Sequence, residues 1–190
     1  MSNSNEEFLR ATLDAMDLVY NIARRMVPRR EDAEDLVQET YLAAFRAWQG
    51  HRRPRQVKPW LATICMNLAR SAYRHRSRRP QEVPWEEMAP FASGDEPESE
   101  AIAALERRAL HRALWALSEE QRTVIALVDL AGFSTRDAAR IMGTPRGTVL
   151  SRLHRGRRAL ASLLEGLESH DLREGELGSP GRVDPFEEEP

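Results

Sequence analysis

Apolar residues recur at three- and four-residue steps along most of this chain, which is the spacing of helices that bury one face. Such stripes run over residues 36–48, 60–72 and 149–164. Polar and charged residues fill the positions between them, and runs of β-branched residues are few. The pattern therefore predicts an all-α fold in which each helix turns one side toward a core.

The segment 134–158 predicts two short helices joined by a tight turn. Ser134 is expected to cap the first helix, and Gly143 can adopt the left-handed conformation that ends it. Thr144 is expected to cap the second helix, with Pro145 in its first turn. Small Ala139 allows the two helices to approach closely. This is the pattern of a helix-turn-helix, whose second helix lies in a DNA major groove.

Arginine dominates this segment. Between positions 134 and 160, seven arginines stand against one acid, Asp137. The buried stripe of the second helix leaves a polar face turned toward the expected groove. The members of this face are Thr148, Ser151, Arg152, Arg155 and Arg158. The alternative is a solvated arginine face on an ordinary helical hairpin, but the turn residues and the charge together favour DNA binding.

Charge divides the chain into blocks, although the net charge is only −2. Residues 51–80 carry nine Lys or Arg residues and no acid, whereas residues 81–106 carry eight acids and no base. We therefore predict two small helical domains, over residues 6–80 and 107–165, joined by a flexible acidic linker over 81–106. Residues 166–190 are rich in acids, Gly and Pro, and are expected to form a disordered tail.

Composition argues against catalysis and against a membrane protein. The single Cys65 cannot form an internal disulfide, and no long apolar segment is present, so a cytoplasmic location is expected. The scattered histidines form no metal-binding or nucleophilic pattern. Asp32, Asp35 and Glu39 could hold Mg²⁺ in a nuclease, but no second acidic cluster accompanies them. We expect no enzyme activity, no metal and no cofactor.

Three stretches resemble a known family. Residues 32–46, DAEDLVQETYLAAFR, resemble region 2.2 of bacterial RNA polymerase sigma factors, and residues 59–70, PWLATICMNLAR, resemble regions 2.3 and 2.4 of the extracytoplasmic-function (ECF) group. Residues 117–157, from LSEEQR to SRLHRGR, resemble region 4. Two blocks in the family's order are more specific than a lone helix-turn-helix. The resemblance covers about residues 10–75 and 108–165.

The resemblance implies a subunit that binds core RNA polymerase, through the β′ clamp helices and the β flap, and directs it to promoter DNA. The positions that match the clamp-binding helix are Asp35, Gln38 and Glu39, beside the apolar Leu36 and Phe45. The alternative is that these acids merely solvate a helix face. Many members of the group are held inactive by an anti-sigma protein, which adds a candidate partner that no residue here identifies.

The resemblance also assigns two DNA-reading faces. The residues expected at the −10 element are Trp60, Asn67, Arg70, Ser71, Arg74 and Arg78, with core packing as the favoured alternative for Trp60. The residues expected at the −35 element are Arg146, Thr148, Ser151, Arg152, Arg155 and Arg158. Leu150 and Met66 depart from the family, which often has a basic residue at both positions.

A stand-alone helix-turn-helix regulator is the alternative function. Such a protein needs a dimerisation helix or an effector pocket, and the sequence contains neither a heptad run nor the signature of an apolar ligand pocket. The stretch that resembles the clamp-binding helix would also have no role in a stand-alone regulator. The sequence therefore favours the sigma factor.

Overall fold

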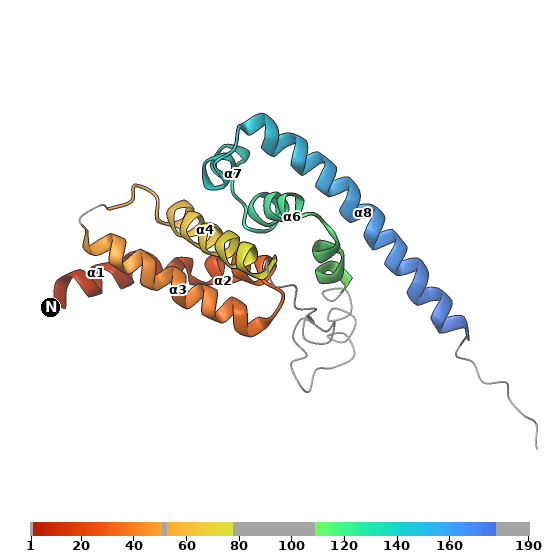
Figure 1. Cartoon of the computed structure of the whole chain (residues 1–190), viewed down its shortest axis with the longest axis horizontal. Helices are drawn as coiled ribbons and strands as arrows, with labels where there is room; N and C mark the ends of the chain where they lie inside the picture. Colours follow the sequence, from red (N-terminus) through yellow and green to blue (C-terminus); the bar gives the residue numbers. More distant parts are fainter. Residues whose placement is uncertain (1, 51–52, 78–108, 178–190) are drawn as a thin grey trace, which may run out of the picture.

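The computed structural model describes residues 2–50, 53–77 and 109–177, and every regular element within these ranges is a helix (Figure 1). The N-terminal module comprises α1 (Ser2–Thr12), the 3-10 turn η1 (Leu13–Ala15), α2 (Met16–Met26), α3 (Arg30–Gln49) and α4 (Val57–Ser77). The C-terminal module comprises a helical segment over 109–116, α6 (Glu119–Ile125), the π-helix η3 (Ala126–Leu130), α7 (Thr135–Met142) and α8 (Arg146–Leu177). The all-α class predicted from the sequence is confirmed.

Helices α2, α3 and α4 of the N-terminal module pack against one another. A cluster of aromatic rings adds to this packing. The ring of Phe8 lies 5.2 Å from that of Phe45 and 5.6 Å from that of Trp48, in edge-on arrangements that favour aromatic pairs. Trp48 lies 6.3 Å from Trp60, so the cluster joins α1, α3 and the start of α4. The predicted stripe over residues 36–48 is the buried face of α3, including Leu36, which is 4% exposed.

The buried face of α4 differs from the predicted one. Leu61 is fully buried as expected, but Ala72, placed in the stripe by its spacing, is exposed. Cys65 and Met66 are fully buried instead. The reason is tertiary, because α2, α3 and α7 all contact α4, and together they cover more of its surface than a single stripe.

The core of the C-terminal module lies between α6, α7 and α8. Val124, Ile141 and Val149 are among its buried residues, as the sequence pattern predicts for the last two. Gly156 marks a close approach of α8 to α6, since a Cβ atom there would lie 3.0 Å from Ile125 Cδ1. A side chain at this position would crowd the packed interior.

The helix that begins at the Ser118 cap is only partly α-helical. The pattern Ser-Glu-Glu-Gln forms a capping box at its start, in which the Gln121 N–H donates to Ser118 Oγ (3.4 Å) and the Ser118 N–H donates to Gln121 Oε1 (3.3 Å). Its last turn, η3, widens to a π-helix, and the Ala131 N–H donates to the carbonyl of Ala126, 2.9 Å away. Gly132, with φ of 72°, then ends the helix.

Helix α8 extends past the boundary expected after residue 165 and runs to Leu177, projecting away from the other helices (Figure 1). The physical reason is that no proline occurs between position 146 and Pro180, and a lone glycine such as Gly166 costs a helix only about 1 kcal/mol. The first part of the expected tail is therefore helical. The rest of it, and the expected linker over 81–106, lie outside the described residues.

The two modules pack directly against each other, whereas the sequence suggested two domains that move independently. Helix α4 contacts α7, and α2 contacts α6 and η3. The Thr123 hydroxyl of α6 donates to Met26 Sδ of α2 at 3.7 Å, and both residues are buried. We call this contact region, formed by α2 and α4 on one side and by α6, η3, α7 and residues 109–116 on the other, the seam.

Candidate nucleic-acid and polymerase interfaces

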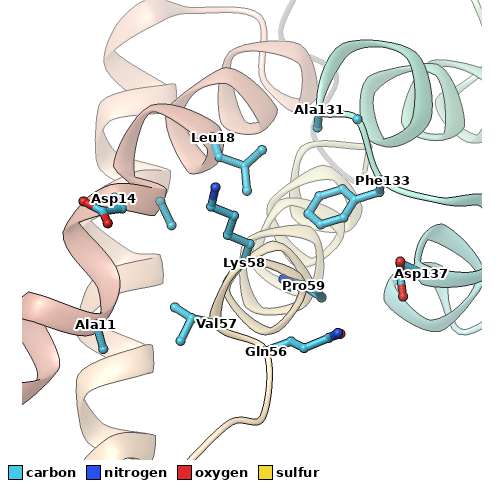
Figure 2. Close-up of a pocket in the computed structure, with 12 residues that line it drawn as sticks. Ala11, Asp14, Leu18, Gln56, Val57, Lys58, Pro59, Ala131, Phe133 and Asp137 are labelled. Carbon is cyan, nitrogen blue, oxygen red and sulfur yellow. The ribbon is translucent and has the colours of Figure 1, made fainter.

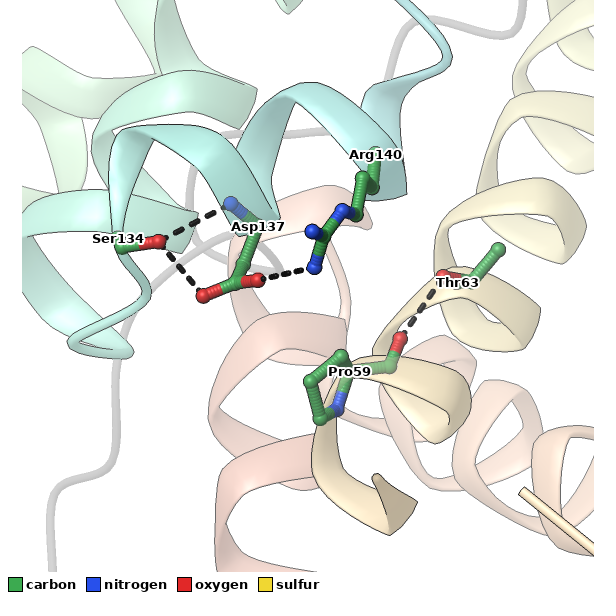
Figure 3. Close-up of polar contacts among 5 residues, drawn as sticks. All are labelled: Pro59, Thr63, Ser134, Asp137 and Arg140. Atoms are coloured by element: carbon green, nitrogen blue, oxygen red, sulfur yellow. Dashed lines mark hydrogen bonds and ion pairs between the residues drawn. The ribbon is translucent and has the colours of Figure 1, made fainter. Parts of the chain in front are cut away.

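Local interactions build the helix-turn-helix as the sequence predicts, with one exception. The Ser134 hydroxyl caps α7 by accepting from the Asp137 N–H (3.1 Å), and the Asp137 carboxylate also pairs with Arg140 at 3.1 Å (Figure 3). Gly143 adopts the left-handed conformation with φ of 63°. The exception is Thr144, whose buried hydroxyl has no hydrogen-bond partner in the part of the chain that the structure describes. The carbonyl of Pro145 instead accepts the first bonds of α8.

The polar face predicted for α8 is present, and most of its members point to solvent. Ser151, Arg155 and Arg158 are exposed, and Thr148 is partly exposed. Arg146 is exposed, and its Nε donates to Thr135 Oγ1 at 3.2 Å, which ties the start of α8 to α7. This arrangement presents a basic helix face of the kind that enters a major groove.

Arg152 is the exception on this face. Its guanidinium lies 3.5 Å from the Glu120 carboxylate of α6, and its side chain is only 23% exposed. Arg157, which was not among the predicted contacts, is likewise held by two bonds to the carboxylate of Asp129, at 2.5 and 3.0 Å. Both arginines are therefore paired with acids of the module, Arg152 mostly covered and Arg157 still exposed, whereas Arg155 interacts with the carbonyl of Ser151 on its own helix.

The face predicted to read the −10 element lies on α4. Asn67 is exposed, and Arg70 and Ser71 are partly exposed. Arg74 belongs to α4, but its side chain lies outside the described residues, as does all of Arg78. Trp60 packs against Trp48 at the head of the helix, in agreement with core packing as its main role.

The polar side chains of the predicted clamp-binding face lie on the surface of α3, whereas the apolar residues predicted beside them pack inward. Asp35, Gln38 and Glu39 are exposed, whereas Leu36 is buried and Phe45 packs against Phe8. Leu36 thus lies in the buried stripe that its spacing predicts, and as a buried side chain it does not contribute a direct contact to the polymerase-binding surface that the resemblance implies. The exposed apolar side chain of this face is Leu42.

Leu42 is 56% exposed and follows Gln38 and Glu39 by four and three residues, so it lies on the same side of the helix. Periodicity alone does not show which edge of an apolar stripe stays uncovered, so Leu42 was not among the predicted contacts. The α3 surface therefore combines three polar side chains with one apolar contact point.

Two cavities open along the seam. The first, of about 590 Å³, has an apolar wall that includes Leu18, Val57 and Phe133, and it is also lined by Asp14 and by Lys58, whose side chain extends toward Leu18 (Figure 2). The second, of about 610 Å³, lies between the start of α4 and α7; its lining includes Trp60, Thr63, Asp137, Arg140 and Ile141. Figure 3 shows how α4 approaches α7: the start of α4, with Pro59 and Thr63, faces α7. The modules thus touch without filling all the space between them.

A buried cationic cluster closes the other end of the seam. His111 is 9% exposed, and its Nε2 accepts from the Trp115 indole N–H at 3.2 Å. Arg122, also buried, stacks over the Trp115 ring with 3.8 Å between guanidinium and ring centroid. Burial, with the nearby charges of Arg24, Arg25 and Arg122, lowers the pKa of His111 to about 4, although the Arg24 backbone favours the protonated form. His111 is therefore neutral at pH 7.

Three further observations concern the alternatives raised by the sequence. Among the described residues, no three His, Cys, Asp or Glu side chains gather in a way that could hold a metal ion. Burial raises the pKa of the Cys65 thiol to about 12, against an opposing hydrogen bond with Thr40. In residues 2–50, 53–77 and 109–177, no helix is both long and apolar enough to cross a membrane.

The fold and its faces define a two-module helical protein with a basic helix-turn-helix, and comparison with known proteins identifies its family. Residues 14–79 match sigma-70 region 2, and residues 107–160 match sigma-70 region 4. The chain is 35% identical to the RNA polymerase sigma-E factor of Streptomyces avermitilis over 167 residues, which cover 88% of this chain and 87% of the relative. It is also 35% identical to the ECF RNA polymerase sigma factor SigM of Mycobacterium tuberculosis, over 77% of this chain and 71% of the relative.

A solved structure agrees. The sigma factor RpoE of Bartonella quintana, determined in complex with the anti-sigma factor NepR, superimposes with a TM-score of 0.70 at 29% identity, covering 84% of this chain and 98% of RpoE. The chain therefore belongs to the ECF group of sigma-70 family RNA polymerase sigma factors. It is thus a sigma factor, which binds core RNA polymerase and directs promoter recognition, and not a stand-alone regulator.

Proposed function

We propose that the three exposed faces divide the work of a sigma factor among named residues. Residues 6–80 bind polymerase and read the −10 element, and residues 107–165 read the −35 element, with 81–106 as the connection between them. The protein supplies recognition and catalyses no reaction itself, and it acts in the cytoplasm, where its polymerase works. The observation that carries this assignment is that each face lies on a separate helix, exposed on a packed module.

The α3 face is the proposed contact with the β′ clamp helices. Asp35, Gln38 and Glu39 supply carboxylate and amide groups at three- and four-residue spacing, and Leu42 adds an apolar contact point beside them. A polar rim with a buried apolar centre is the usual anatomy of a protein interface. Leu36 and Phe45 support this face from the core side, so they position α3 and do not touch the partner.

The α4 face is the proposed reader of the −10 element. Asn67 carries an amide that can hydrogen-bond a base edge, and Arg70 and Ser71 lie near it as partners for phosphates or bases. Arg74 and Arg78 extend the same basic sequence toward the end of α4 and add attraction to the DNA backbone. Trp60 supports the helix by packing against Trp48.

The α8 face is the proposed reader of the −35 element. Arg155 and Arg158 are exposed, and among the described residues neither has an acidic partner, so they are available for bases and phosphates. Thr148 and Ser151 lie on the same face, and Arg146 stands at the helix start, where backbone N–H groups favour phosphate. Arg152 approaches DNA only by leaving Glu120, and its contribution is therefore the smallest of the arginines on this face.

We also propose a regulatory protein as a partner. The Bartonella quintana RpoE structure contains the anti-sigma factor NepR, and this chain shares the fold of that sigma factor over most of its length. A protein that holds the two modules together would keep their DNA-reading faces from reaching both promoter elements. The β flap of polymerase remains the proposed contact of region 4 in the active complex.

Binding to core polymerase tests the assignment. Purified chain is mixed with core bacterial RNA polymerase, the affinity is measured, and run-off transcription is performed from a genomic promoter library. Tight binding with transcription from a restricted set of promoters is expected. Sequence-specific binding to duplex DNA by the chain alone, without polymerase binding, would instead establish the stand-alone regulator.

A further inference from the structure

Leu150 is an exposed leucine in the middle of the DNA-reading helix. It is 46% exposed, while its neighbour Val149 is fully buried and Leu153 is 5% exposed. Gly147, three residues before it, and His154, four residues after it, are exposed as well. The side chain therefore contributes little to the core and stands on the outer surface of α8.

The polar groups around Leu150 are engaged within the chain. The Ser151 hydroxyl donates to the carbonyl of Thr148 at 3.0 Å, so only its lone pairs face outward. Arg152 is drawn toward Glu120, and the Arg155 Nε interacts with the carbonyl of Ser151 at 3.4 Å. Leu150 is therefore an apolar point at the edge of a polar face whose nearest members also make contacts within the chain.

Gly147 allows this apolar surface to come close to a partner. A Cβ atom at Gly147 would meet nothing within 4 Å, so internal packing does not require a glycine there. The missing side chain permits the first turn of α8 to approach an external backbone closely. An approach at Gly147 brings Leu150, one turn further along the same side, to the depth of the base edges.

We propose that Leu150 determines specificity by recognising the 5-methyl group of a thymine in the −35 element. Leucine can neither donate nor accept a hydrogen bond, and the thymine methyl is the apolar group among the base edges of the major groove. The inference rests on the proposed role of α8 as the helix that enters this groove. It adds an apolar contact to the hydrogen-bonding residues that the family resemblance supplies.

Replacing thymine with uracil tests this contact, because deoxyuridine differs only in lacking the methyl group. Holoenzyme made from the full chain and core polymerase is bound to a promoter selected from the library, and each −35 thymine on either strand is replaced in turn. One position is expected to lose about fourfold in affinity, the value of burying one methyl group. With the Leu150→Ala variant, the same replacement should have no effect.

Two controls separate the possible results. Leu130→Ala removes another exposed leucine of the C-terminal module and should leave the sensitivity to uracil unchanged. Thermal unfolding of Leu150→Ala should match the parent, because the side chain is exposed. Sensitivity to uracil that persists in Leu150→Ala, or its absence at every −35 position, would overturn the contact. If promoter binding still depends on the −35 sequence, only the Leu150 contact is overturned and the proposed role of α8 stands. If promoter binding does not depend on the −35 sequence, both the Leu150 contact and the proposed role of α8 are overturned.

Discussion

Acidification is expected to destabilise the protein through His111. The imidazole is neutral in the folded protein because its Nε2 accepts the Trp115 N–H, and because burial and nearby arginines lower its pKa to about 4. In the unfolded chain the pKa returns to about 6.5. Between these two values only the unfolded state takes up a proton, so stability is present near pH 7 and is lost as the pH falls.

The size of the effect follows from the two pKa values. Between pH 7 and pH 5, this single group should lower the free energy of unfolding by about 2 kcal/mol, and the loss should level off at about 3 kcal/mol below pH 4. Urea denaturation at pH 7 and pH 5 measures it. Carboxylates also titrate at acid pH, so the informative quantity is the difference between the parent and a variant without this titration.

His111→Gln provides that variant, since the amide oxygen can still accept the Trp115 N–H but does not titrate in this range. The parent is expected to lose about 2 kcal/mol more than this variant between the two pH values. His154→Gln is the matched control, because His154 is exposed on α8 and its replacement should leave the pH dependence of the parent unchanged. Equal pH dependence of the parent and His111→Gln would refute the reasoning.

Two glycines of α8 allow a comparison. Gly156→Leu should lower the free energy of unfolding by about 1–3 kcal/mol, because the new side chain crowds α6. Gly166→Ala should raise it by up to about 1 kcal/mol, because a Cβ atom there meets nothing within 4 Å and alanine favours the helix. Urea denaturation measures both, and a Gly156→Leu protein as stable as the parent would contradict the close approach. The double replacement of Asp35 and Glu39 by Ala should weaken binding to core polymerase and leave the unfolding midpoint unchanged; undiminished transcription would show that α3 does not bind the clamp. Arg155→Ala should weaken −35 recognition by about 1–3 kcal/mol in promoter binding by holoenzyme, and unaltered discrimination between −35 sequences would exclude a base contact.

Local features were predictable from the sequence, and features that depend on packing were not. The Ser134 cap, the left-handed Gly143 and the Ser118 capping box involve residues within a few positions of one another, so the sequence pattern specifies them. How much of the apolar stripe of α3 is covered depends on the helices packed against it, and for this reason the sequence predicts the buried Leu36 but not the exposed Leu42. Contacts between side chains of different helices cannot be predicted from the sequence pattern for the same reason.

Ion pairs between side chains of different helices determine which arginines of α8 are available to a partner. Arg152 and Arg157 look equivalent to Arg155 along the sequence, yet Glu120 and Asp129 hold the first two against the module. Those acids lie 32 and 28 positions away from their partners, beyond the reach of a helical pattern. The packing of the modules against each other is a further example, because no local signal marks Met26 and Thr123 as neighbours.

The seam also sets a conformational equilibrium that acts on promoter binding from a distance. The −10 and −35 elements are about 25 base pairs apart by name, or about 85 Å of B-DNA. Because α4 and α7 are in contact, we expect the packed modules to lie too close together to reach both elements. We therefore expect polymerase to bind a separated form, so that the free energy that closes the seam is subtracted from its apparent affinity. If the closed form were favoured over the separated form by 99 to 1, the apparent affinity of the chain for polymerase would be about 100-fold lower than the affinity of the separated form. Substitutions that loosen the seam should then strengthen binding to polymerase, although they lie on neither the polymerase-binding nor the DNA-reading faces.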